Sequence, residues 1–139
     1  ILMHKHGTPK TMQVNVSTND HLIEDIYLFL KERVNLCRKI GLQHVFVDPG
    51  IGFGKTYDDN LRLINNLDVF LELECPVVLG TSRKSFIGNI SGATVDNRLG
   101  GSIGSNLLAW KRGASIFRIH DVAQTKQAFD VVHAIEAVS

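Results

Sequence analysis

Residues 44–56 read HVFVDPGIGFGKT, an apolar run that stops at Asp48 and gives way to a loop with three glycines. The β-branched and aromatic side chains of 44–48 favour a short buried strand. Pro49 and the glycines after it end that strand, because proline lacks a backbone donor and glycine interrupts regular structure. The stretch therefore predicts a strand, then a tight loop, then the helix that the apolar spacing of 58–71 indicates.

The same order of strand, turn and helix recurs four times along the chain. The expected strands are 1–4, 44–48, 76–80 and 115–120, and the expected helices are about 19–40, 58–71, 94–112 and 121–138, with a helical turn at 86–90. Thr94 and Asp121 are the expected N-caps of the last two helices. Such alternation with short connections predicts parallel βαβ units in one α/β unit, and the apolar strands indicate a sheet covered on both faces.

Composition excludes several classes of protein. The 139 residues carry 15 Lys+Arg against 14 Asp+Glu, a net charge of +1, so neither nucleic acid nor an anionic membrane is the expected partner. No apolar run approaches the roughly 20 residues that span a bilayer, and no signal-peptide pattern begins the chain, so a cytoplasmic protein is expected. Cys37 and Cys75 are too few for a disulfide scaffold and are expected to be reduced and packed as small apolar groups.

Polar side chains follow each predicted strand, at the edge where parallel α/β folds bind ligands. They are His4, Asp48, Ser82, Arg83, Lys84, Arg118 and His120. Asp48 has two interpretations of equal weight, an Asx turn or helix cap, and a carboxylate that accepts N–H groups from a guanidine-like heterocycle edge. Arg118 and His120 lie two apart on a predicted strand and so point the same way, which favours an anion such as phosphate. The alternative pairs Arg118 with a carboxylate.

Two other motifs are weaker. The loop 50–56 lacks P-loop spacing because Pro49 stands where the first glycine belongs, and it also fails the dinucleotide fingerprint. A nucleotide-binding protein with a doubly wound sheet therefore remains only an alternative. His4 and His6 form an H-x-H pair, but without a third ligand nearby they are interpreted as surface loop residues rather than as a metal site.

Four motifs together resemble the dihydropteroate synthases, a family of pterin-binding enzymes. They are Leu2-Met3-His4 through Gly7-Thr8-Pro9-Lys10-Thr11-Met12-Gln13, then Asp48 to Lys55, Ser82-Arg83-Lys84-Ser85, and Arg118-Ile119-His120-Asp121-Val122. The resemblance covers essentially the whole chain. It implies a (β/α)8 TIM barrel that condenses 6-hydroxymethyl-7,8-dihydropterin pyrophosphate with p-aminobenzoate, giving 7,8-dihydropteroate and pyrophosphate in folate biosynthesis. Pterin-binding methyltransferases rank second, since they lack the Ser-Arg-Lys-Ser cluster.

The resemblance also implies roles for individual residues. Asp48 matches the carboxylate that grips the amino-pyrimidine edge of the pterin, and Lys84 matches the lysine that reaches the pterin ring and borders the aminobenzoate site. The other implied substrate-binding residues are Met3 beneath the pterin, Phe53 and Ser82 near the aminobenzoate, Gly80 and Arg83. Arg118, Ile119 and His120 match the segment that holds the leaving pyrophosphate. The implied catalytic residues are Lys84, Arg118 and His120.

Only half of the implied barrel is expected in these residues. A closed (β/α)8 barrel typically needs about 250 residues, and the chain opens on Ile1-Leu2-Met3 as though inside a strand. Residues 1–139 are therefore expected to be the C-terminal half, inactive alone, with a non-catalytic pterin-binding half-barrel as the alternative. The resemblance places the Mg²⁺ ligand on the N-terminal half, with no metal ligand in this segment. It further implies a homodimer through the late helices, where Val131 and Ile135 are interface or core residues.

Overall fold

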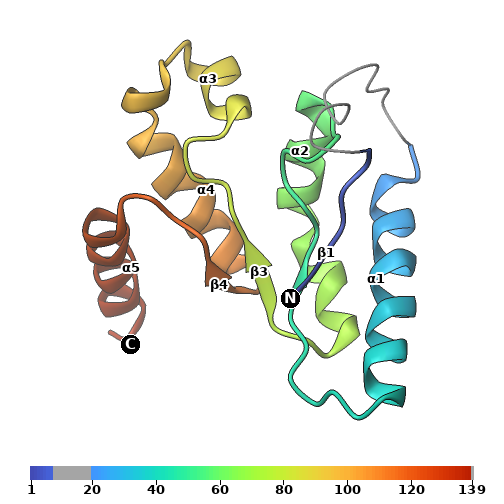
Figure 1. Cartoon of the computed structure of the whole chain (residues 1–139). Coiled ribbons are helices and arrows are strands. Elements are labelled where there is room, and N and C mark those ends of the chain that lie inside the picture. The colour runs from blue at the N-terminus through green and yellow to red at the C-terminus, as the bar shows by residue number, and fades with distance from the viewer. Residues whose placement is uncertain (8–19, 139) are drawn as a thin grey trace.

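The computed structural model describes residues 1–7 and 20–138, which form a parallel sheet with helices between its strands (Figure 1). In chain order the elements are β1 (Leu2–Met3), α1 (Leu22–Lys39), β2 (Val47–Asp48), α2 (Tyr57–Asn65), the 3-10 helix η1 (Leu67–Leu73), β3 (Val77–Leu79), α3 (Ser85–Ser91), the 3-10 helix η2 (Val95–Asn97), α4 (Leu99–Lys111), β4 (Ala114–Phe117) and α5 (Val122–Glu136). Residues 8–13 of the first motif and residue 19, where the first helix was expected to begin, lie outside the described residues.

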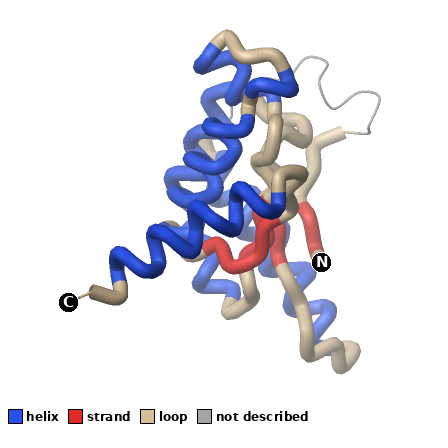
Figure 2. Tube along the Cα trace, turned by 90° about the vertical axis from the view of Figure 1, so that its left-hand side faces the viewer, coloured by secondary structure: helices blue, strands red, loops and turns tan. Residues whose placement is uncertain are grey.

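The four strands pair in the order in which they occur in the sequence, β1-β2-β3-β4, and every pair is parallel. Met3 lies opposite Asp48, and Val77 lies opposite both Val47 and Ala114. Because parallel strands all end at the same edge of a sheet, the segments after β1, β2, β3 and β4 meet there. In Figure 2 the strands lie beside the N-terminus, and α5 runs from them toward the C-terminus.

The hydrophobic core lies between the sheet and the helices that connect its strands. Helix α1 buries Leu22, Ile26, Leu30 and Val34, which are four residues apart and so share one face of the helix. The fully buried residues facing them include Leu63, Leu67, Phe70, Val77 and Leu79. Each such side chain contributes about 1.5–3 kcal/mol by leaving water. The helix predicted at about 19–40 is confirmed as α1.

The helix predicted at 58–71 is two elements, α2 and η1, with the break at Asn66. Asn66 has φ −120° and ψ 33°, and its side-chain amide donates to the Arg62 carbonyl at 2.8 Å. The Asn66 backbone amide donates to the same carbonyl at 3.1 Å, so the side chain folds back on the last turn of α2 while the backbone leaves helical geometry. Helix α2 begins with a capping box in which the Thr56 hydroxyl accepts from the Asp59 amide at 3.1 Å.

The expected caps of the last two helices are wrong in detail. Thr94 precedes the short η2, and its hydroxyl accepts from the Asn97 side chain at 3.0 Å instead of from the backbone. Helix α4 begins after a break at Arg98. Asp121 is the N-cap residue of α5, but its carboxylate makes no cap bond because it pairs with Arg83.

Helix α5 exposes much of its apolar surface in this chain. Phe129 packs against Trp110 and Phe117, with ring centroids 5.2 and 5.1 Å apart. Val131 and Ile135 are 54% and 67% exposed, so the core interpretation of these two residues is wrong and their place in a dimer remains a prediction.

The two cysteines are free thiols, Cys75 buried and Cys37 half-buried. Burial raises the pKa of the Cys75 thiol. Among residues 1–7 and 20–138, no helix is both long enough and apolar enough to cross a bilayer.

Candidate functional site

An ion pair between Asp48 and Arg118 lies at the carboxyl edge of the sheet. Asp48 is 1% exposed, and its Oδ2 accepts from Arg118 Nη2 at 2.5 Å while its Oδ1 accepts from the Gly50 amide at 2.7 Å. The guanidinium lies against Gly80, where a Cβ would come within 3.3 Å of Nη2. The bond from the Gly50 amide is the one that an Asx turn makes, while the contact of Asp48 with a heterocycle stays a prediction. Arg118 takes the alternative partner, a carboxylate.

Arg118 and His120 lie beyond β4, which ends at Phe117. The alternation of side chains along a strand therefore does not set their directions, and the prediction that both point the same way loses its basis. The Arg118 amide still donates to the Leu79 carbonyl at 2.8 Å. This bond holds the residue beside β3 while its side chain reaches Asp48.

The glycine loop after β2 wraps around a buried lysine. Lys55 is 4% exposed, and its Nζ donates to the carbonyls of Gly50 at 2.8 Å and Phe53 at 3.2 Å. Gly50 has φ +76°, and a Cβ there would lie 1.8 Å from the His4 carbonyl oxygen, so only glycine fits. Burial lowers the pKa of Lys55 to about 8, although the charge of Asp48 raises it in part.

His4 joins the end of β1 to this loop. Its amide donates to the Asp48 carbonyl at 3.0 Å, its Nδ1 lies 3.1 Å from Lys55 Nζ, and its ring meets Phe29 edge-on at 5.0 Å. Burial lowers the pKa of His4 to about 4, and the charge of Lys55 lowers it further, so the ring is neutral at pH 7 and Nδ1 accepts. The surface interpretation holds for the exposed His6 but is wrong for half-buried His4.

Lys84 reaches the same loop from the segment after β3. Its Nζ donates to the Ile51 carbonyl and lies 4.5 Å from the centre of the Phe53 ring. Burial lowers the pKa of Lys84 to about 8, the carboxylate of Asp48 raises it, and Arg118 lowers it. The structure thus brings Lys84 and Phe53, both predicted near one substrate, into direct contact.

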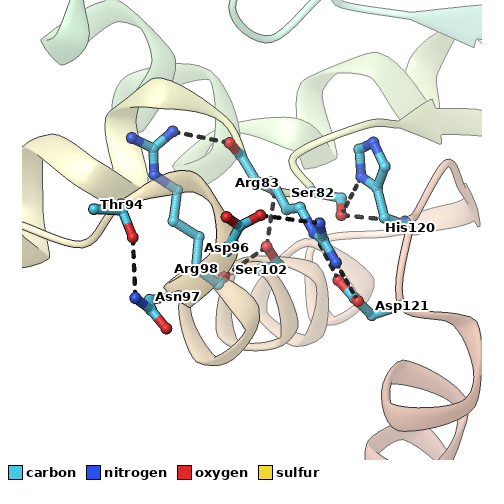
Figure 3. A network of polar contacts seen from close by, with 9 residues as sticks. All are labelled: Ser82, Arg83, Thr94, Asp96, Asn97, Arg98, Ser102, His120 and Asp121. Atoms are coloured by element: carbon cyan, nitrogen blue, oxygen red, sulfur yellow. Dashed lines mark hydrogen bonds and ion pairs between the residues drawn. The ribbon is translucent and has the colours of Figure 1, made fainter.

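Ser82 and His120 join the ends of β3 and β4. The Ser82 hydroxyl lies 2.9 Å from His120 Nδ1 and accepts from the His120 amide at 3.3 Å (Figure 3). In the ring tautomer that carries its proton on Nε2, the Ser82 hydroxyl donates to Nδ1 while its oxygen accepts from the His120 amide. His120 then presents an N–H donor on the side of the ring away from Ser82.

The remaining predicted residues divide between this edge and its surroundings. Met3 Sδ lies 4.0 Å from Arg118 Nη2, and half-buried Ile119 lies between Arg118 and His120. The side chain of Arg83 bonds to Asp121 instead of to Asp48 (Figure 3).

Sequence reasoning missed two residues that shape the site, Lys55 and Asn60. The Asn60 side chain accepts from the Gly52 amide at 2.5 Å and donates to the Thr56 carbonyl at 2.7 Å. Lys55 and Asn60 also line a polar pocket of about 250 Å³ between the glycine loop and α3, together with Thr56, Tyr57, Ser85, Phe86 and Asn89. The available signal was a lysine directly after a glycine loop, but loop composition alone does not show that its ammonium turns inward.

The described residues do not fit a magnesium site. Mg²⁺ prefers several oxygen ligands, carboxylates above all. Within the described ranges no three His, Cys, Asp or Glu residues come together as metal ligands. Both oxygens of Asp48 already accept hydrogen bonds.

Comparisons with known proteins show which family the chain resembles. Residues 1–120 match the family model described as "Pterin binding enzyme". The chain is 39% identical over 135 residues to the dihydropteroate synthase of Haemophilus influenzae, covering 96% of this chain and 49% of the relative. It is also 39% identical over 136 residues to a bifunctional dihydropteroate synthase/dihydropteroate reductase of Helicobacter pylori, covering 98% and 36%.

Solved structures give the same result. A Stenotrophomonas maltophilia dihydropteroate synthase with bound imidazole matches with a TM-score of 0.93 and 37% identity, covering 99% of this chain and 53% of that one. The Xanthomonas albilineans enzyme with 4-aminobenzoic acid matches with a TM-score of 0.88 and 36% identity, covering 99% and 49%. A Thermus thermophilus enzyme in complex with 6HMPPP matches at 0.85 and 32%, covering 95% and 51%.

The chain spans about half the length of most of these relatives, and its four parallel βα units match about half of a dihydropteroate synthase TIM barrel, as predicted. The polar edge of its sheet carries Asp48, Ser82, Lys84, Arg118 and His120, which belong to three of the motifs on which the resemblance rests. The chain belongs to the pterin-binding enzyme family, as a homologue of the dihydropteroate synthases.

Proposed function

We propose that this chain supplies the C-terminal half of a dihydropteroate synthase active site, and that catalysis needs the complete barrel. The observation that carries the proposal is the buried Asp48 carboxylate at the sheet edge, with the cations Arg118, Lys55 and Lys84 around it. A carboxylate so placed suits the N–H groups of a pterin edge, and the cations suit a diphosphate. The homodimer, which the resemblance implies, and the cytoplasmic location, which the sequence composition favours, are further predictions.

Substrate entry requires Arg118 to change partners. Its Nη2 occupies Asp48 Oδ2 in this chain, so the pterin edge and the guanidinium compete for one oxygen. The Arg118 side chain is 51% exposed, whereas Asp48 is buried, so the arginine is the partner that moves. A diphosphate near the end of β4 offers the released guanidinium a bidentate anionic partner. The ion pair between Asp48 and Arg118 therefore favours binding of ligands that carry both a pterin edge and a phosphate group.

The proposed reaction is a substitution at the pterin methylene carbon. The amine nitrogen of p-aminobenzoate forms a bond to that carbon, the carbon–oxygen bond to the diphosphate breaks, and pyrophosphate leaves with the electron pair. The nitrogen then loses its proton to solvent or to the departing pyrophosphate. Arg118 and the Nε2–H of His120 are placed to stabilise the charge that develops on the leaving oxygen. The amine is already nucleophilic, so positioning contributes more than a strong base.

Direct binding tests the proposal. Calorimetry of the chain with 6-hydroxymethyl-7,8-dihydropterin pyrophosphate is expected to show binding, and the same titration with ATP is expected to show none. Binding of ATP without the pterin would favour the nucleotide-binding alternative. A second test fuses the chain behind the N-terminal half of the Haemophilus influenzae enzyme and measures dihydropteroate formation. If the chain binds the pterin pyrophosphate but the fusion forms no dihydropteroate, the chain is the non-catalytic half-barrel.

Lys84→Ala and Arg118→Ala are each expected to lower turnover of that fused barrel at least about tenfold. Each variant removes a cation from the path of the developing negative charge, and one such donor is commonly worth a factor of this size or more. Steady-state rates of dihydropteroate formation measure the effect, with Lys126→Ala on the exposed face of α5 as the control. Unchanged rates in both variants would remove these two residues from the mechanism.

The affinity for the pterin pyrophosphate is expected to fall as the pH rises. The pKa of Lys84 is lowered to about 8, so its ammonium carries a charge at pH 7 and has lost most of it by pH 9.5. Losing one cation from a diphosphate site weakens the affinity by about tenfold. This factor corresponds to a difference of roughly one unit between the lysine pKa with and without the ligand. Calorimetry between pH 7.5 and 9.5 measures the slope. In Lys84→Met the change of affinity with pH is expected to shrink to the part that Lys55 contributes. An identical change in the wild-type chain and in Lys84→Met would exclude Lys84 as the group that titrates.

A further inference from the structure

Arg83 has a backbone conformation that non-glycine residues rarely adopt. Its φ is +58°, in the left-handed region where a side chain costs free energy unless the surroundings hold it. Both of its backbone polar groups are held by α4 and the turn before it. The Arg83 amide donates to Ser102 Oγ at 2.8 Å, and the Arg83 carbonyl accepts from Arg98 Nη1 at 3.0 Å (Figure 3).

The side chain of Arg83 crosses to the start of α5. Nε donates to Asp121 Oδ2 at 3.1 Å and Nη2 donates to Asp121 Oδ1 at 2.6 Å, a two-bond fork that only arginine makes. The hydrogen bonds from Arg83 lower the pKa of Asp121, and the carboxylate raises the pKa of Arg83. Asp96, at 4.0 Å from Nη1, is 93% exposed and adds little.

The neighbours of this pair in the sequence are the candidate substrate residues. Arg83 lies between Ser82 and Lys84, and Asp121 directly follows His120. The fork therefore ties the segment after β3 to the segment after β4 at the place where Ser82 meets His120. A left-handed residue between Ser82 and Lys84 also turns the chain, so that one side chain contacts His120 and the other contacts the glycine loop.

We propose that Arg83 is a positioning residue, which with Asp121 holds Ser82 against His120 and so fixes the donors that receive the diphosphate. Arg83 does not itself touch the substrate. The inference deepens the proposed function and rests on it for the identity of the ligand, but the Ser82–His120 contact can be measured without any ligand. This assignment replaces the substrate-binding role that the sequence resemblance implied for Arg83.

Charge distinguishes positioning from direct contact. Arg83→Met removes a positive charge and Asp121→Asn removes a negative one, so a purely electrostatic effect on an anion has opposite signs in the two variants. If Arg83 contacted the phosphate, Arg83→Met would weaken binding while Asp121→Asn would leave it unchanged or tighten it. If the pair acts by position, both variants weaken binding, and the double variant is no worse than either single one.

The experiment uses inorganic pyrophosphate as the probe and the folded chain as the sample. Calorimetry at pH 7 is expected to show about a fivefold loss of affinity in Arg83→Met, in Asp121→Asn and in the double variant, with a smaller loss in Arg83→Lys. Nitrogen NMR of the His120 ring is expected to show that Nδ1 loses its hydrogen bond to Ser82 in the same variants. Lys126→Met and Asp130→Asn, which break an exposed ion pair on α5, serve as matched controls and are expected to change neither reading.

Three results would overturn the proposal. They are an unchanged His120 spectrum in both variants, opposite changes of affinity, or losses that add in the double variant. Failure of the proposed function gives a different outcome. The wild-type chain then fails to bind the pterin pyrophosphate, while the His120 spectrum still responds to Arg83→Met and Asp121→Asn.

Discussion

Asp48→Asn is expected to lower the affinity of the chain for the pterin pyrophosphate by about 10- to 100-fold. The carboxylate is 1% exposed and presents two acceptor oxygens, whereas an amide presents one acceptor and one donor. A donor that faces the N–H groups of the pterin cannot replace a charge-assisted bond worth about 1.5–3 kcal/mol. Calorimetry with the pterin pyrophosphate measures the loss.

The same substitution has a second effect, which separates the pterin edge from the diphosphate. Without its negative partner, the Arg118 guanidinium no longer has to leave Asp48 before it binds phosphate. Inorganic pyrophosphate is therefore expected to bind Asp48→Asn at least as well as it binds the wild-type chain. Asp58→Asn, at an exposed position in the first turn of α2, controls for the loss of one negative charge. Equal losses for both ligands would place Asp48 on the phosphate side and contradict the proposed pterin contact.

Lys55→Met is expected to destabilise the chain by about 2 kcal/mol at pH 7, and by more as the pH rises. Its Nζ donates to the carbonyls of Gly50 and Phe53 and to His4 Nδ1, and methionine leaves these buried acceptors without a donor. Methionine fills a similar volume, so the loss reports the hydrogen bonds more than a cavity. Urea unfolding followed by circular dichroism measures the free energy of unfolding.

The pH dependence follows from the direction of the Lys55 pKa shift. In the folded chain the pKa of Lys55 is lowered to about 8 from its ordinary value of 10.5, so between these values the unfolded chain holds the proton and the folded chain does not. Lys55 therefore contributes stability that grows as the pH rises from 7 to 10 and is lost as the pH falls through 8. The gap between wild type and Lys55→Met is expected to widen by about 2–3 kcal/mol over that range. Parallel pH profiles would show that Lys55 does not titrate inside the loop, and Lys126→Met, on an exposed lysine, is the control.

Much of the fold was predictable because its signals are local. The apolar spacing of α1 and the β-branched run before Asp48 depend only on neighbouring residues. The predicted helix forms, and the strand predicted over 44–48 forms only at Val47–Asp48. The boundaries were less predictable, since the helix predicted at 58–71 breaks at Asn66 and β4 stops before Arg118. The site residues follow the same rule. Asp48 at the end of β2 and Ser82 after β3 lie where strand order puts them, while strand alternation does not set the direction of Arg118, which lies past the end of β4.

The sequence by itself determined the alternation of strands and helices, the family, and which polar residue types gather at one edge of the sheet. Only the tertiary structure decided how those residues pair. Asp48 and Arg118 are 70 positions apart, and Arg83 and Asp121 are 38 apart. Such contacts depend on how loops turn, and here they turn at the left-handed residues Gly50 and Arg83. Composition does not reveal whether a loop lysine turns outward to solvent or, like Lys55, inward to carbonyl groups, because that choice is made by the atoms that surround it after folding.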